Sequence, residues 1–173
     1  MKKKILLSIF FIFSCSLSFA NEKIAFIDIE FLLAKSTAGK SVLSNLDKLN
    51  KKNISNLKSQ EKNLIKEREE LDKLRNISSQ EDMNIKIQAF QKKIEQFNNQ
   101  KVDLSSKFNK KRDEETLALL KKINPIISEY MEKNQITVIF DKKNIYIAKS
   151  ELDITKPVLE IINSKIKWIY EIK

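Results

Sequence analysis

Hydrophobic positions divide the chain into a short apolar start, two long helical stretches and a mixed end. Residues 24–29 are β-branched, aromatic or apolar with one Asp, and they predict a buried strand. From Glu30 the apolar positions follow a helical period, and after an interruption at 36–40 we expect a new helix as far as Leu74. Residues 76–82 are rich in cap and turn residues, so the chain should reverse there and form a second helix from 81 to 123.

The two long helices carry apolar residues at spacings of three and four, the pattern of a coiled-coil seam. The second helix supplies Met83, Ile87, Phe90, Ile94, Phe97, Leu104 and Phe108, interrupted by Lys101. The first supplies Leu43, Leu46, Leu57, Leu64, Leu71 and Leu74, with Asn50, Asn53, Gln60 and Glu67 at the other seam positions. Because this stripe is too thin to bury a globular core, it predicts a self-contained antiparallel helical hairpin over 40–122, which we call the arm.

Beyond the arm the pattern becomes globular again. We expect Asn124 to cap a short helix that has Pro125 at its first position. Residues 136–140 and 145–148, separated by the turn residues 141–144, predict a β-hairpin. Thr155 is expected to cap a final helix with Pro157 in its first turn. The apolar face of that helix comprises Val158, Ile162, Ile166 and Ile169.

The predicted fold class is therefore α+β, mostly α, with the arm inserted in a small β-containing body made of residues 21–39 and 123–173. Three short strands with two or three short helices are marginally stable alone, and free sheet edges favour pairing with other chains. We therefore expect the body to oligomerise. The apolar residues expected at that interface are Ile24, Phe26, Ile27, Val138, Ile139, Phe140, Ile145 and Ile147.

The first twenty residues have the pattern of a secretory signal peptide. Three lysines precede an apolar stretch, and the small residues Ser18 and Ala20 fit a cleavage site between Ala20 and Asn21. The apolar stretch is about half of the ~20 residues that a membrane-spanning helix needs. Two alternatives stay open, a retained anchor and a lipid-modified Cys15. The expected location is outside the cytoplasm.

Composition excludes most catalytic chemistry. The chain has no His, one Cys and one Gly, which excludes His-dependent triads, Cys/His zinc sites and glycine-rich phosphate loops. Paired carboxylates such as Glu69 and Glu70 are expected on exposed helix surface, where no pocket would shift a pKa. We predict that the protein is not an enzyme and that it needs no metal or cofactor.

Charge is distributed unevenly along the predicted arm. Residues 40–66 hold 7 basic and 2 acidic residues, 83–112 hold 8 and 2, and the tip at 67–82 holds 3 and 6. Because the two basic segments lie side by side in an antiparallel hairpin, we expect them to form one basic belt along the arm. The belt is either a solvated face or a binding surface for an anionic partner. Its residues are Lys48, Lys51, Lys52, Lys58, Lys62, Lys66, Lys92, Lys93, Lys107, Lys110, Lys111 and Arg112.

Among anionic partners, nucleic acid is disfavoured because the chain has only three arginines, no recognition motif and a signal peptide. Anionic lipid or lipopolysaccharide and acidic unfolded polypeptide both remain.

Both ends of the mature chain resemble a known family. The opening, Lys23 to Asp28 followed by 36–40, is similar to the Skp/OmpH family of periplasmic chaperones, and so are the closing segments 138–141, 145–148, 152–155, 158–159 and 162–163. The resemblance implies a homotrimer with a small central β-barrel, three arms around a cavity, and ATP-independent holding of unfolded outer-membrane proteins in the periplasm. The acidic arm tip and the tail 165–173 depart from that family's usual pattern.

The sequence is therefore compatible with two functions. The first is a holdase chaperone that binds many unfolded clients through adaptable apolar spots and a charge field. The alternative is a structural coiled-coil adaptor or spacer of the cell envelope with one fixed partner. Breadth of client binding distinguishes the two.

Overall fold

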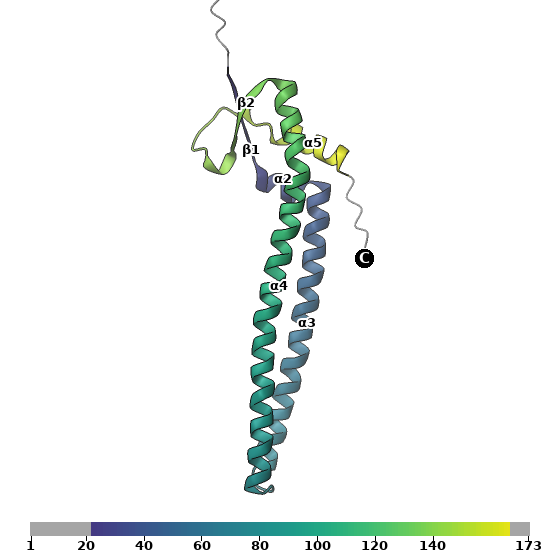
Figure 1. The fold of residues 1–173 in the computed structure, drawn as a ribbon, viewed down its shortest axis with the longest axis vertical. Helices are drawn as coiled ribbons and strands as arrows, with labels where there is room; N and C mark the ends of the chain where they lie inside the picture. Colours follow the sequence, from purple (N-terminus) through teal and green to yellow (C-terminus); the bar gives the residue numbers. More distant parts are fainter. Residues whose placement is uncertain (1–21, 167–173) are drawn as a thin grey trace, which may run out of the picture.

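The computed structural model describes residues 22–166 and shows a long helical hairpin attached to a small body (Figure 1). The predicted signal peptide with Cys15, its cleavage site between Ala20 and Asn21, and the tail beyond Ile166, which includes Ile169, lie outside these residues. In chain order the elements are β1 (Lys23–Ile27), α2 (Ile29–Lys35), α3 (Thr37–Leu74), α4 (Gln80–Asn134), β2 (Ile136–Asp141), the 3₁₀ turns η1 (Lys142–Asn144) and η2 (Ser150–Leu152), and α5 (Thr155–Lys165).

Local cap signals place the ends of the arm as predicted. Ser36 is the N-cap of α3, and its hydroxyl accepts a hydrogen bond from the N–H of Gly39 at 3.0 Å. α3 then ends at Leu74, and Ser79 caps α4 by accepting from the N–H of Asp82. The predicted strand is confirmed but is shorter, because Asp28 already caps α2 and Ile29 is helical.

The predicted β-hairpin at 136–148 is wrong. β2 pairs in parallel with β1, in the register Ile24 to Val138 through Ile27 to Asp141, and residues 145–148 form no strand. Lys142–Asn144 form a 3₁₀ turn that leads the chain away from β2. Parallel strands need a long crossover connection, and here α2, α3 and α4 together supply it. On the other side of β1, Phe26 forms a single bridge to Asp153.

The predicted helix break at Asn124 is also wrong, because α4 continues through Pro125 to Asn134. Proline inside a helix removes one backbone hydrogen bond and favours a kink. On either side of it, Leu119, Ile123 and Ile126 are buried in the core at 1%, 0% and 7% exposure. Packing of this face therefore outweighs the local preference of proline.

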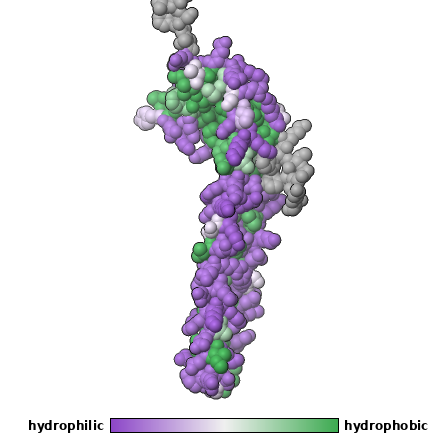
Figure 2. All heavy atoms as spheres, viewed as in Figure 1, coloured by the Kyte–Doolittle hydropathy of each residue, from purple (hydrophilic) through white to green (hydrophobic). Residues whose placement is uncertain are grey.

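The body surrounds one hydrophobic core built from both chain ends and the top of the arm. Its most deeply buried large side chains are Leu32, Leu119, Ile123, Val158 and Ile162. Val158 and Ile162 confirm the predicted inward face of α5. Figure 2 shows the difference in surface character: green apolar residues gather on the body, whereas the arm is mostly purple.

The only glycine of the chain lies where α2 crosses the start of α3. A Cβ atom added at Gly39 would stand 1.6 Å from the carbonyl oxygen of Leu33 and 2.9 Å from the hydroxyl of Ser36. The first distance is to backbone, which cannot move without displacing α2. Gly39 therefore permits the close crossing that fixes α2 against the arm.

Replacing Gly39 by Ala should destabilise the protein by at least about 2 kcal/mol. In an unobstructed helix the same change would stabilise by roughly 1 kcal/mol. The sign of the change in unfolding free energy therefore shows whether α2 obstructs this position. Urea unfolding measures the change, and Ser44→Ala, at an exposed position of the same helix, is the control and should be close to neutral. A stabilised Gly39→Ala variant would show that α2 and α3 do not approach this closely.

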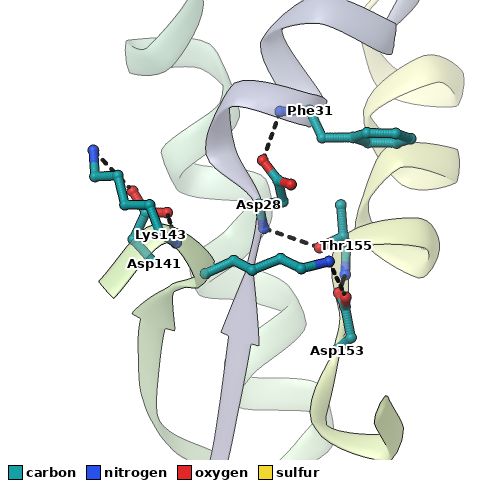
Figure 3. A network of polar contacts seen from close by, with 7 residues as sticks. Asp28, Phe31, Asp141, Lys143, Asp153 and Thr155 are labelled. Atoms are coloured by element: carbon teal, nitrogen blue, oxygen red, sulfur yellow. Dashed lines mark hydrogen bonds and ion pairs between the residues drawn. The ribbon is translucent and has the colours of Figure 1, made fainter. Parts of the chain in front are cut away.

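A polar network joins the C-terminal end of β1 to the start of α5 (Figure 3). The Asp28 N–H donates to the hydroxyl of Thr155 at 2.9 Å, and the Thr155 N–H donates to Asp153 at 2.9 Å. Lys142 pairs with the other carboxylate oxygen of Asp153 at 3.0 Å. The predicted capping role of Thr155 is wrong: its hydroxyl accepts from Asp28, and Ile154 precedes the helix without a side-chain cap.

Two carboxylates that accept hydrogen bonds from lysine, Asp153 and Glu129, have lowered pKa values. Partial burial opposes the shift at Asp153, but hydrogen bonds from Thr155 and the charge of Lys142 lower its pKa below the ordinary 3.8. Between α4 and α5, hydrogen bonds from Lys133 and Lys165 to Glu129 hold the pKa of that exposed carboxylate at about 2.

Because the folded-state pKa of Asp153 is depressed, its stabilising contribution is complete above the unfolded pKa and is lost as the pH falls through the folded value. Below 3.8, the parent should therefore lose stability relative to Asp153→Asn. Urea unfolding at pH 7 and at pH 3 compares the two proteins, with Asp103→Asn, an exposed arm carboxylate paired with Lys107, as control. The result would contradict this reading if the stability difference between parent and Asp153→Asn were the same at both pH values.

Candidate functional site

The arm is held by a narrow seam between α3 and α4. Leu57, Leu64 and Leu71 are half-buried there, as are Phe90 and Phe97 on the facing helix. Polar residues also occupy the seam, as the sequence indicates: Asn53, Gln60 and Glu67 are half-buried, and Glu67 pairs across it with Lys93 at 2.6 Å. Lys101 is exposed, with its ammonium 5.9 Å from the centre of the Phe97 ring.

Four residues predicted to lie in the seam lie beside it instead, and one of them is Asn50, which is exposed. Leu43, Ile87 and Ile94 are 51%, 40% and 38% exposed. A seam that follows a spacing of 3.5 residues drifts on straight helices of 3.6 residues per turn, so some of its nominal members point sideways. These side chains are thus available on the flank of the arm.

Exposed aliphatic side chains recur on that flank. Leu43, Ile54 and Ile65 of α3 are 51%, 45% and 54% exposed and follow one another at steps of eleven residues. Eleven residues are close to three full turns of helix, so the three side chains project in nearly one direction. Together with Ile87 and Ile94 of α4 we call them the apolar row.

Both halves of the apolar row lie on the same side of the hairpin. Near the body, Leu43 lines a common cavity with Arg112 and Thr116 of α4, so this flank of α3 and the flank of α4 that carries Arg112 share one face. Ile87 and Ile94 lie on that flank of α4, because they precede Arg112 by 25 and 18 residues, which are nearly whole numbers of turns. The ion pair between Glu67 and Lys93 shows which residues of the two antiparallel helices lie at the same height along the arm. By this alignment Ile65 lies beside Ile94.

The opposite side of the hairpin is polar. A cavity of about 320 Å³ there is lined mainly by polar side chains, among them Asn63 and Glu67 of α3 and Lys93 and Gln96 of α4, together with Leu64 and Phe97 of the seam. We call it the polar groove. On 3.6-residue helices, Lys107 and Lys111 fall on the same flank of α4 as Lys93. The two sides of the arm therefore differ in chemistry.

All twelve residues of the predicted basic belt are exposed. Six of them form ion pairs with neighbouring carboxylates: Lys51 with Asp47, Lys93 with Glu67, Lys107 with Asp103, Lys110 with Glu114, Lys111 with Glu115 and Arg112 with Asp113. Within residues 22–166, Lys48, Lys52, Lys58, Lys62, Lys66 and Lys92 form no ion pair. These six lie on the outer sides of the helices, away from the seam.

The predicted oligomerisation residues fall into two groups in the single chain. Phe26 and Ile27 are buried, and Ile139 and Ile145 are half-buried. Ile24, Val138, Phe140 and Ile147 are exposed at 45%, 38%, 48% and 85%. The unpaired edge of the two-stranded sheet thus lies among exposed apolar side chains.

The arm tip combines the acidic segment 67–82 with two exposed isoleucines. Ile77 is 79% exposed and Ile85 62%. Among the described residues, no group of three or more Asp and Glu side chains is arranged to hold a metal ion. Within the same range, no helix is both long and apolar enough to cross a bilayer.

A body with a parallel strand pair and an inserted helical hairpin defines the class of this fold, and comparisons with known proteins assign it. The model of the family described as outer membrane protein (OmpH-like) matches residues 23–162. The chain belongs to this OmpH-like family.

A solved structure shares the fold. It is the crystal structure of a Caulobacter crescentus CB15 protein described as an outer membrane chaperone (OmpH-like), and it aligns with a TM-score of 0.79 over 87% of this chain and 89% of that chain, at 17% identity. No curated protein matches the chain.

Two features were not predicted from the sequence: the apolar row, and the cavity that Leu43 lines together with Arg112 and Thr116, next to α2. The signal for the row was present in the eleven-residue spacing of Leu43, Ile54 and Ile65. The cavity depends on the crossing angle of α2 over α3, which no local pattern encodes.

Proposed function

We propose that this chain is an ATP-independent periplasmic holdase that binds unfolded outer-membrane proteins and prevents their aggregation. Membership of the OmpH-like family and the description of the similar Caulobacter structure support it. The observation in the chain itself that carries the proposal is the arm, which presents exposed aliphatic side chains and unpaired lysines along its length instead of one shaped pocket.

Such a surface suits a binder of many sequences. Scattered aliphatic residues each contribute a small, non-directional attraction to apolar segments of a client, while cations attract acidic segments over a longer range. α3 alone has 38 residues, which at 1.5 Å per residue is ~57 Å. A client chain can therefore touch many weak sites at once and still leave without an energy source.

The proposed holdase is a homotrimer. A two-stranded sheet is marginal in water, and its strand β2 carries the exposed side chains of Val138 and Phe140. Strands of further copies would pair with the free edge of this sheet and cover those side chains. The copy number of three, and the central barrel, are taken from the family resemblance.

Light scattering tests the holdase function. Two unrelated outer-membrane β-barrel proteins are diluted from denaturant with and without the protein, and aggregation of both should be suppressed without ATP. A structural adaptor with one fixed partner would leave both aggregation curves unchanged.

Assembly through the sheet edge predicts that Val138→Asp disrupts the oligomer. Val138 is exposed in the single chain, so the charge is costly only where a second copy covers it. Sedimentation equilibrium should show a smaller species for Val138→Asp and an unchanged trimer for the matched control Val102→Asp, which lies on the arm at 71% exposure. A folded monomeric parent at micromolar concentration would contradict the proposed assembly.

Client capture through charge predicts that reversal of unpaired lysines slows association. Lys48, Lys52, Lys66 and Lys92 are changed together to Glu, which removes no ion pair of the arm. The association rate with a denatured outer-membrane protein, measured by stopped flow, should fall and lose part of its salt dependence, whereas dissociation should change less.

The same four positions changed to Gln are the matched control and should give an intermediate association rate. Circular dichroism checks that the helices are intact, since exposed charges contribute little to stability. An association rate equal to that of the parent at low salt and at about 0.15 M salt would identify these lysines as a solvated surface.

A further inference from the structure

A cavity of about 280 Å³ lies where α2 crosses the upper end of the arm. Its apolar lining comes from Leu33 and Ala34 of α2, Val42, Leu43 and Leu46 of α3, and Leu119 of α4. We call it the α2 pocket. Ala34 and Leu43 are exposed, so the pocket opens to solvent on the side of the apolar row. Gly39, where α2 crosses α3, also lines it.

The charges at the α2 pocket favour an uncharged occupant. Its two ionisable lining residues, Glu30 and Arg112, have opposite charges. The Arg112 guanidinium already donates to Asp113, from Nε at 3.1 Å and from Nη2 at 3.0 Å. An anionic headgroup or an acidic segment thus finds no free cation there, whereas an apolar side chain meets an apolar wall.

Size and position limit the occupant further. At about 280 Å³ the pocket lies at the lower end of the range of small-molecule sites, about 300–1,000 Å³, and has room for one bulky side chain. Leu43 belongs both to the pocket wall and to the apolar row, which continues down α3 at Ile54 and Ile65. A chain segment lying on the row would reach the pocket at its upper end.

We propose that the α2 pocket holds one bulky aliphatic or aromatic side chain of an unfolded client and anchors the adjoining client segment on the apolar row. This inference rests on the proposed holdase function and specifies the face of the arm that the client uses. The polar groove on the other side of the same hairpin is the natural comparison, because its cavity is similar in size but its lining is mainly polar.

The test places a fluorescent label beside each cavity in turn, so that the label itself fills neither cavity. The sole cysteine, Cys15, is changed to Ser and the sole tryptophan, Trp168, to Phe. Bimane, which tryptophan quenches on contact, is attached at Asn50→Cys, an exposed position one turn beyond Leu46 of the pocket wall. In the comparison protein it is attached at Ser59→Cys, an exposed position one turn before Asn63 of the polar groove. A denatured outer-membrane protein containing tryptophan should quench the label at position 50 and leave the label at position 59 nearly unchanged.

A pocket-filling pair gives an independent readout. Ala34→Phe fills the α2 pocket from an exposed position, and client affinity should become about tenfold weaker, the effect of losing one buried apolar side chain. Asn63→Phe in the polar groove is the matched control and should bind as the parent does. Thermal unfolding checks that both variants fold.

Other results would overturn the inference. Quenching at position 50 without client, seen only when Trp168 is retained, would identify the chain's own C-terminal segment as the occupant. Loss of dye accessibility at position 50 with rising protein concentration would identify a second copy. Client quenching at position 59 instead, with Ala34→Phe binding normally, would place the client on the polar face. If the parent suppresses no aggregation at all, the holdase function itself fails, which light scattering reveals before any label is read.

Discussion

The parallel pairing of β1 with β2 is the constraint on which the other features depend. It joins the first described strand to one that follows the arm, so α2, α3 and α4 must together form the crossover. Closing a long connection costs only about 0.6 kcal/mol more for each doubling of its length, so a long arm is tolerated. The pairing also brings Asp28 to Thr155 and Phe26 to Asp153, which fixes the root of the arm between both chain ends.

A two-helix arm inserted in this way has side chains that it cannot cover. Each helix buries one stripe against the other, and the flanks stay open, so the character of the flanks is free of packing constraints. Here one side of the hairpin carries Leu43, Ile54 and Ile65, and the opposite side contains the polar groove with Lys93. The same geometry that makes the arm long therefore also gives it two chemically different sides.

Local sequence signals were enough to predict the arm, but they did not predict which strands pair. Ser36, the turn before Gln80 and the end of α3 at Leu74 depend on neighbouring residues, and the sequence located them. The hairpin at 136–148 was predicted because two apolar segments flank a turn, but β2 found its partner in β1, far away along the chain. Pro125 was read as a helix start, yet the burial of Ile123 and Ile126 keeps α4 continuous. At the candidate site the exposure of the belt lysines followed from sequence, whereas the α2 pocket depends on how closely Gly39 lets two helices cross.

Separation of charge from apolar surface has a consequence for how a holdase of this kind would work. Cations act over about a Debye length, ~8 Å at physiological salt, so lysines on the outer sides of α3 and α4 can attract a client before it touches the arm. The apolar row acts only on contact, and its exposed fractions near one half leave each residue only part of its surface to bury. Attraction would then govern how often clients arrive, and the sum of many partial burials would govern how long they stay. A row of isolated aliphatic residues gives no single contact strong enough to trap a client. The α2 pocket adds an apolar space next to the body, at the upper end of the row.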